Sequence, residues 1–252
     1  MADTARPKES FIYERDGLDF YTEPGWCVDL LLDAEKYLGR VWDPACGNGT
    51  IGRAFERRNH PIRSTDIAPR PYAERMLDFL DAEDASYTRA DHIVCNPPFS
   101  LAEDFIRRGL RMATKSAAFL LPLKWLASDT RQRFFAEVGR PARVYVLADR
   151  ASMPPGMYLD AETGLFNCDD PSPKLKDGKP VYRWRTGDKP SGGSIDYCWV
   201  VFVPGYGGPT DLRWLSKASL KDHSAGRPKR SPPRSVKPHY KPAPERALSR
   251  NG

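Results

Sequence analysis

The sequence predicts an α/β fold in which a doubly wound, mostly parallel β-sheet carries helices on both faces. Short apolar runs alternate along the chain with amphipathic segments, which is the pattern of repeated strand–helix units. The chain has 252 residues, of which 40% are hydrophobic, and this suits one packed α/β domain. A glycine-rich turn follows the first apolar run, as expected where a strand passes into a helix in such a sheet.

The expected elements follow one another in the order that this fold requires. Apolar and β-branched runs predict strands at residues 40–46, 62–67, 93–95, 117–123, 143–148 and 197–203. Helical spacing of apolar residues predicts helices at residues 50–59, 101–113 and 129–138. The strand at 93–95 must stop at Pro97-Pro98, because proline has no N–H with which to continue a ladder.

Two segments depart from this alternation. Residues 150–195 are rich in proline and glycine and carry several aromatic side chains, so we expect a functional insertion, with a plain solvated loop as the alternative. Residues 216–252 contain ten Lys/Arg and two acids, a net charge of +8 in a chain whose total is +6. We therefore expect a folded domain over residues 1–215 and a basic, disordered tail that binds polyanions or serves only solubility.

Composition excludes several classes of protein. No run approaches the ~18 apolar residues of a membrane span, and residues 1–9 lack the apolar core of a signal peptide, so we expect a cytoplasmic protein without a membrane partner. No C-x-x-C pair occurs, and the four histidines are scattered, so we expect neither a disulfide framework nor a metal site. The cysteines are expected to be small buried thiols.

The first motif with chemical content is DPACGNG, from Asp43 to Gly49, between a predicted strand and a predicted helix. Its glycines permit a tight turn and close approach of the backbone to a ligand, although a plain strand–helix turn would look similar. Asp66 ends the next predicted strand, where an acid can bond both hydroxyls of a ribose or can simply cap a helix. The position of Asp66 one unit after the glycines favours the ribose contact.

The second motif is the tetrapeptide Asn96-Pro97-Pro98-Phe99. An aromatic amine is a poor nucleophile, because its lone pair is delocalised into the ring, and attack on an electrophile builds positive charge on nitrogen. The Asn96 side-chain carbonyl and the Pro97 backbone carbonyl can accept the amine's two N–H bonds and stabilise that charge. Consecutive prolines hold the loop extended, and Phe99 can stack on an extruded base. A simple strand-ending turn is the alternative.

These two motifs together resemble class I S-adenosylmethionine-dependent methyltransferases, most closely the DNA adenine amino-methyltransferases, over roughly residues 20–204. The resemblance implies a seven-stranded sheet with a reversed last strand, and S-adenosyl-L-methionine as cofactor. The sequences FYTEP and DFL look like the family's other two cofactor motifs. The resemblance then implies cofactor contacts from Tyr21, Thr22, Asp43, Ala45, Gly47, Asp66 and Asp78, with Asp81 as an alternative to Asp78. The catalytic set would be Asn96, Pro97, Pro98 and Phe99.

By this resemblance the substrate is an adenine in DNA, and residues 150–195 would read the target sequence, with Arg150, Arg183 and Arg185 as candidates. Trp125 and Lys124 are candidates for the base pocket, with core packing and solvation as equal alternatives. Related loops also serve enzymes that methylate RNA adenines, protein glutamine amides or, with serine in place of asparagine, cytosine N4. A non-catalytic nucleic-acid-binding module is a further alternative. The sequence predicts neither the recognition site nor the oligomeric state.

Overall fold

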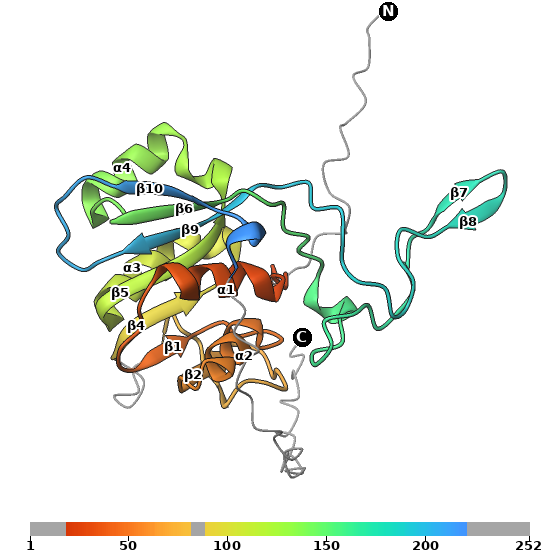
Figure 1. The fold of residues 1–252 in the computed structure, drawn as a ribbon, viewed down its shortest axis with the longest axis horizontal. Helices are drawn as coiled ribbons and strands as arrows, with labels where there is room; N and C mark the ends of the chain where they lie inside the picture. Colours follow the sequence, from red (N-terminus) through yellow and green to blue (C-terminus); the bar gives the residue numbers. More distant parts are fainter. Residues whose placement is uncertain (1–18, 82–88, 221–252) are drawn as a thin grey trace, which may run out of the picture. The chain divides into compact units, whose positions relative to one another are not determined.

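The structure, a computed structural model, describes residues 19–81 and 89–220. Its centre is an eight-stranded sheet in the order β10-β6-β9-β5-β4-β1-β2-β3 (Figure 1). The sheet strands are β1 (Val41–Asp43), β2 (Ile62–Asp66), β3 (Arg75–Met76), β4 (Ala90–Cys95), β5 (Ala113–Pro122), β6 (Arg143–Leu147), β9 (Tyr197–Phe202) and β10 (Asp211–Leu215). The helices are α1 (Gly25–Ala34), α2 (Thr50–Arg57), α3 (Ala102–Met112) and α4 (Asp129–Val138). Short 3-10 turns are η2 (Phe99–Leu101), η3 (Leu123–Leu126), η4 (Gly156–Tyr158) and η5 (Lys217–Ser219).

The predicted α/β class and the mostly parallel sheet are confirmed, and one strand runs in reverse. β9 lies antiparallel between β5 and β6, as expected for the run at 197–203. The sheet has one strand more than the seven expected, because β10 returns parallel to β6 and adds an outer edge. The reversed strand is therefore not the last. β10 escaped prediction because its sequence, DLRWL, mixes charges with a Trp214 side chain that stays 65% exposed.

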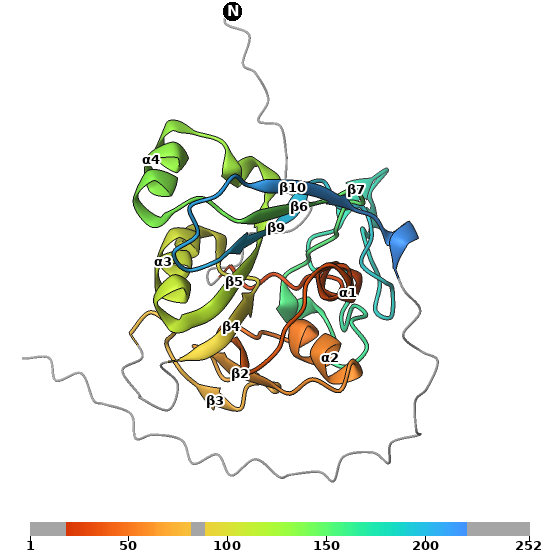
Figure 2. The same ribbon diagram turned by 60° about the vertical axis from the view of Figure 1, so that its left-hand side comes forward.

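Helices cover both faces of the sheet, with α1 and α2 on one side and α3 and α4 on the other (Figure 2). The central strands are buried on both faces, so alternate side chains enter different halves of the core. On β9, Trp199 and Val201 pack into the half that contains α1 and α2, whereas Val200 and Phe202 pack into the half that contains α3. This double burial accounts for the uninterrupted apolar sequence YCWVVF.

The insertion at 150–195 has a small core of its own, in which Leu159, Phe166 and Trp184 are buried together. Its outer part is a two-stranded ribbon of β7 (Lys174–Lys176) and β8 (Lys179–Val181), which lies away from the main sheet in Figure 1. The two strands are joined by Asp177-Gly178, both with positive φ, 53° and 73°. This is the Asp-Gly turn preferred in two-residue hairpins, because its backbone twist matches that of the strands.

The ordered chain continues beyond residue 215, where the tail was expected to begin. Ser216 caps the turn η5, and the Lys217 ammonium lies 4.3 Å from the centre of the Trp26 ring on α1. The rest of the expected tail, residues 221–252, lies outside the described residues. Within the described ranges no helix is long and apolar enough to span a membrane. The same ranges contain no group of three or more His, Cys, Asp or Glu side chains arranged to hold a metal ion.

Candidate active site

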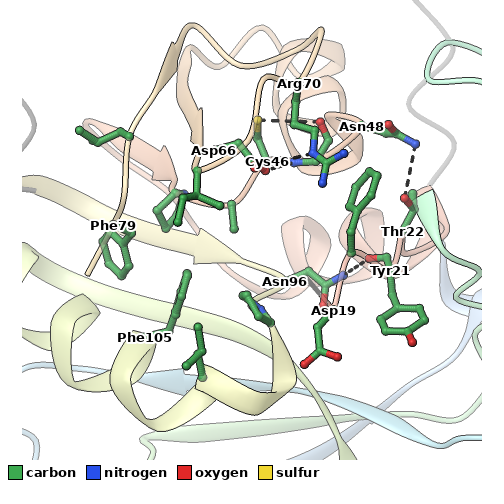
Figure 3. Close-up of a pocket in the computed structure, with 18 of the residues that line it drawn as sticks. Asp19, Tyr21, Thr22, Cys46, Asn48, Asp66, Arg70, Phe79, Asn96 and Phe105 are labelled. Atoms are coloured by element: carbon green, nitrogen blue, oxygen red, sulfur yellow. Dashed lines mark hydrogen bonds and ion pairs between the residues drawn. The ribbon is translucent and has the colours of Figure 1, made fainter. Parts of the chain in front are cut away.

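Two cavities lie beside the carboxyl ends of the parallel strands. The smaller, of about 140 Å³, is lined by the turn after β1, by Asp66 at the end of β2 and by Asn96 after β4 (Figure 3). The chain passes from β1 outward to β2 and β3 and then returns to β4 on the other side of β1. This reversal is the switch point at which open α/β sheets bind ligands. The larger cavity, of about 690 Å³, shares Asp19 and Tyr21 with the smaller one, so the two adjoin.

The glycine turn after β1 is packed tightly against aromatic rings. Gly47 has a φ of +49°, and its N–H donates to the Asp66 carboxylate over 2.9 Å. A Cβ at Gly47 would lie 2.7 Å from the Phe20 ring, and one at Gly49 would clash with the Tyr72 ring. The Arg70 guanidinium covers the Phe20 ring at 3.6 Å and approaches Asp66 at 3.7 Å. The glycines are therefore required by close packing as well as by backbone conformation.

Acids gather around the smaller cavity: Asp19, Glu23, Asp66 and Asp78 line it, and Asp43 is buried beneath the turn. Burial raises the pKa of Asp43 well above its usual range, and the nearby Glu23 and Asp66 carboxyls raise it further. Burial also raises the pKa of Glu23 to about 7. Carboxyl groups that are withdrawn from water and crowded together favour a cationic ligand beside them. The cavity is thus suited to positive charge.

Asn96 is held by both protons of its side-chain amide. Its Nδ2 donates to the Tyr21 carbonyl over 2.9 Å and to Glu23 Oε2 over 2.8 Å. Its Oδ1 is buried and accepts no hydrogen bond from any described residue. A buried acceptor without a donor is costly in a folded protein, by about 1–3 kcal/mol, and Asn96 Oδ1 is therefore available to a donor that comes from outside the described chain. The anchored nitrogen and the free oxygen give the amide one defined orientation.

The larger cavity is lined with aromatic rings. Phe99 lies parallel to Tyr21, with 6.4 Å between ring centroids, and the Tyr197 ring lies 6.0 Å from Phe99 at a tilt of 38°. Trp125 also lines the cavity and is covered by the Arg131 guanidinium at 3.7 Å from its ring centre. Lys124 lines the same cavity with an exposed side chain. A planar aromatic ligand would thus find ring faces and a cation in one place.

The insertion packs against the segment before α1 and the glycine turn, and it lines the larger cavity. The Thr22 N–H donates to the Pro154 carbonyl and the Gly156 N–H to the Phe20 carbonyl, over 3.0 and 2.8 Å. Asn48, in the glycine turn, donates to the Gly156 carbonyl over 3.1 Å. Both ends of the insertion, at 151–153 and 193–195, line the larger cavity. The insertion is therefore built into the site and is not a separate appendage.

The structure brings most of the residues singled out from the sequence into the site. The smaller cavity is lined by Tyr21, Thr22, Ala45, Gly47, Asp66, Asp78, Asn96 and Pro98. Phe99 lines the larger cavity, whereas Pro97 is buried and lines neither. Of the two acids that the sequence left open, Asp78 is in the lining and Asp81 is not. Asp78 is exposed there, and its carboxylate accepts the Leu80 N–H.

The three arginines proposed to read a target are engaged within the protein. Each forms an ion pair with an aspartate: Arg150 with Asp196, Arg183 with Asp170 and Arg185 with Asp169. The ion pair of Arg183 with Asp170 joins the two segments that flank the ribbon, and its Asp170 side chain is fully buried. Sequence reasoning also missed Phe20, Glu23 and Arg70 as site residues. Phe20 and Glu23 lie within the motif FYTEP, which was a signal for these two residues. No motif contained Arg70.

Comparisons with known proteins give structural likeness only. No family model and no curated sequence matches the chain. A modification subunit named for a type I restriction enzyme of Vibrio vulnificus YJ016 has a TM-score of 0.47 and 17% identity. The match covers 81% of this chain and 50% of that one, so the chain spans half the length of the Vibrio protein.

Two further structures are similar at a lower level. A SAM-dependent O-methyltransferase of Thermotoga maritima has a TM-score of 0.40 and 11% identity, covering 73% of this chain and 66% of that chain. TrmN of Thermus thermophilus has a TM-score of 0.33 and 21% identity, covering 44% and 40%. Likeness at this level carries no argument about function, which must come from the site itself.

Proposed function

We propose that the protein transfers a methyl group from S-adenosyl-L-methionine to the exocyclic amine of an adenine in DNA. The observation that carries the proposal is the Asn96 amide, whose nitrogen is anchored and whose buried oxygen has no donor among the described residues. An amine that gains positive charge during methylation needs a hydrogen-bond acceptor beside its nitrogen, and Asn96 Oδ1 would be that acceptor. The resemblance of NPPF to the loop of adenine amino-methyltransferases supports the same assignment.

The smaller cavity fits the cofactor in charge. S-adenosyl-L-methionine supplies a methyl group activated by a sulfonium cation. Asp66, Asp78 and the backbone of Gly47 would hold its polar parts, and the carboxyl groups of Glu23 and Asp43 would favour its positive charge. The volume of about 140 Å³ is below the ~300–1,000 Å³ of typical ligand pockets. We therefore expect Phe20 and the overlying Arg70 to shift when the cofactor binds.

The larger cavity would hold the target base. An adenine paired inside duplex DNA is out of reach, so the base must be extruded, at a cost of a few kcal/mol. Stacking on an aromatic ring contributes about 1–3 kcal/mol per base, which is comparable. Phe99, with Tyr21 and Tyr197 beside it, offers the stacking face. The adjoining Asn96 Oδ1 would accept an N–H of the amine and stabilise the charge that develops there.

The insertion would provide contacts to DNA outside the base pocket. Lys176 and Lys179 are cross-strand neighbours on the exposed ribbon, and like charges in that position are unfavourable without an anion nearby. A two-stranded ribbon can enter the major groove. We assign the ribbon, with Lys124 at the cavity, to DNA contact, and the paired Arg150, Arg183 and Arg185 to holding the insertion together.

Methyl-labelled cofactor tests this proposal directly. The full chain is incubated with labelled S-adenosyl-L-methionine and with DNA, RNA or a protein extract in separate reactions. We expect label in DNA, recovered as N6-methyladenine after digestion, and none with the Asn96→Ala variant. Label that appears only in RNA or protein would overturn the assignment of substrate. A wild-type protein that binds the cofactor but transfers no methyl group to DNA, RNA or protein would support the non-catalytic alternative.

A further inference from the structure

Glu23 is a buried acid that lies at the smaller cavity and also bonds the Asn96 amide. It lies in the segment before α1 and is only 7% exposed to solvent. The described residues offer it no ion pair. The hydrogen bond of 2.8 Å from Asn96 Nδ2 to Glu23 Oε2 joins two residues that are 73 positions apart in the chain. A carboxyl group without a cation is expensive to bury, so its retention here calls for a function.

We propose that Glu23 is a positioning residue, which in its ionised form fixes the Asn96 amide with the carbonyl oxygen turned to the substrate amine. This inference rests on the proposed function. An ionised carboxylate accepts hydrogen bonds and donates none, and the same is true of the Tyr21 carbonyl. Turning the amide over would place the Asn96 oxygen against these two acceptors. Ionised Glu23 therefore permits one orientation of Asn96 and excludes the other.

Protonation of Glu23 would remove this constraint. A neutral carboxyl has an O–H that can donate, so it tolerates either orientation of the amide. The reversed amide would present its NH₂ to the substrate amine, where an acceptor is needed. A negative charge on Glu23 also polarises the amide and makes the Asn96 oxygen a stronger acceptor. Both effects predict that the ionised form is the active one.

The environment of Glu23 places this protonation near neutral pH. Burial raises its pKa to about 7, and the hydrogen bond from Asn96 opposes the rise. Within residues 19–81 and 89–220, the titratable groups that face Glu23 are the Asp43 carboxyl from β1, the Cys27 thiol from α1 and the Cys95 thiol from β4. Burial raises the pKa of each of the three. An acid with a raised pKa is ionised above that pKa, so methyl transfer should increase with pH through about 7 and then level off. A cation bound in the cavity should move this midpoint lower.

The first arm of the test needs no catalysis. The side-chain NH₂ signals of Asn96 are followed by NMR in the cofactor-free protein from pH 5 to pH 9. We expect a shift with a midpoint near 7 in the wild type and no such shift in Glu23→Gln. Glu137→Gln, which changes an acid on α4 that pairs with Arg107, is the matched control and should titrate like the wild type. A wild-type spectrum that does not change, or the same midpoint in Glu23→Gln, would overturn the proposal.

The second arm measures kcat, KM and cofactor affinity against pH. Residues that orient a metal ligand by a hydrogen bond typically cost about 10- to 100-fold in activity when they are lost. Glu23 would orient Asn96 in the same way, so its loss should lower kcat by a similar factor. The rise with pH should disappear in Glu23→Gln, while the KM for DNA changes little. A uniform fall in cofactor affinity with an unchanged pH profile would show a merely structural role.

The two arms separate this proposal from the proposed function. If no substrate is methylated, the NMR titration still shows whether Glu23 controls the Asn96 amide. If Glu23→Gln fails to fold, the wild-type titration still decides, and Glu23→Asp, which keeps the charge, provides the second variant. We expect Glu23→Asp to retain a pH-dependent shift of the Asn96 signals. A Glu23→Asp protein that folds without such a shift would contradict control by the charge.

Discussion

Replacing Gly47 by alanine should damage the site through two separable effects. At a φ of +49° an L-residue is strained, by about 1–2 kcal/mol. The new methyl group would also lie 2.7 Å from the Phe20 ring, which is held between Gly47, Gly156 and the Arg70 guanidinium. Overpacking of this kind adds about 1–3 kcal/mol. The displaced ring has the smaller cavity beside it, so we also expect cofactor affinity to fall about tenfold or more.

Gly164 offers a matched control. Its φ is +68°, yet a Cβ there would have nothing within 4 Å. Gly164→Ala therefore carries the backbone strain without the overpacking, and both variants share the same loss of freedom in the unfolded chain. The difference between them isolates the packing contribution. At about 2–4 °C per kcal/mol for a domain of this size, Gly47→Ala should melt about 2–12 °C below Gly164→Ala.

Thermal or denaturant unfolding measures the stability difference, and calorimetric titration with S-adenosyl-L-methionine measures the affinity. Gly164→Ala should bind the cofactor as the wild type does. Equal melting temperatures for the two variants would refute the packing argument. Equal cofactor affinities would refute the placement of the cofactor beside Gly47.

Three further predictions concern nucleic acid. Phe99→Ala should reduce the fluorescence rise of 2-aminopurine placed at the mapped target site, because stacking on the ring contributes about 1–3 kcal/mol. Phe99→Tyr should retain the rise, and equal signals from the two variants would exclude Phe99 as the stacking residue. Changing Lys176 and Lys179 to glutamine should lower the slope of log affinity against log salt by about 0.9 for each lost phosphate contact, and an unchanged slope would remove the ribbon from the interface. Deleting residues 221–252 should flatten the slope further while sequence preference persists, and a lost preference would show that the tail reads bases.

The sequence predicted elements whose burial pattern is strong. The helix at 129–138 was placed at its observed bounds, because Ser128 caps its first turn and Gly139, with a φ of 94°, ends it. β9 was visible because burial on both faces leaves no polar position. In contrast, β3 has two exposed residues, Arg75 and Met76, so it leaves no apolar pattern. α1 was missed, since it begins directly after Pro24 with a glycine and carries no side-chain cap.

The candidate site was predictable where chemistry is local to a motif. Gly47 and Asn96 stand in short sequences that restrict what they can do, and Asp66 ends a recognisable strand. The partners of these residues were not predictable, because they depend on contacts between distant segments. Glu23 meets Asn96 only when the segment before α1 folds across β4, and Arg183 meets Asp170 only inside the insertion. Residues that orient others leave little trace in a single sequence.

Direct sequencing of modified bases tests the central claim. The wild-type chain and the Asn96→Ala variant are expressed in a host that lacks adenine methylation, and the genomic DNA of each is read for modified positions. We expect N6-methyladenine in the wild type, concentrated at a defined sequence, and none with Asn96→Ala. N4-methylcytosine in place of N6-methyladenine, or N6-methyladenine that persists in the Asn96→Ala variant, would contradict the account.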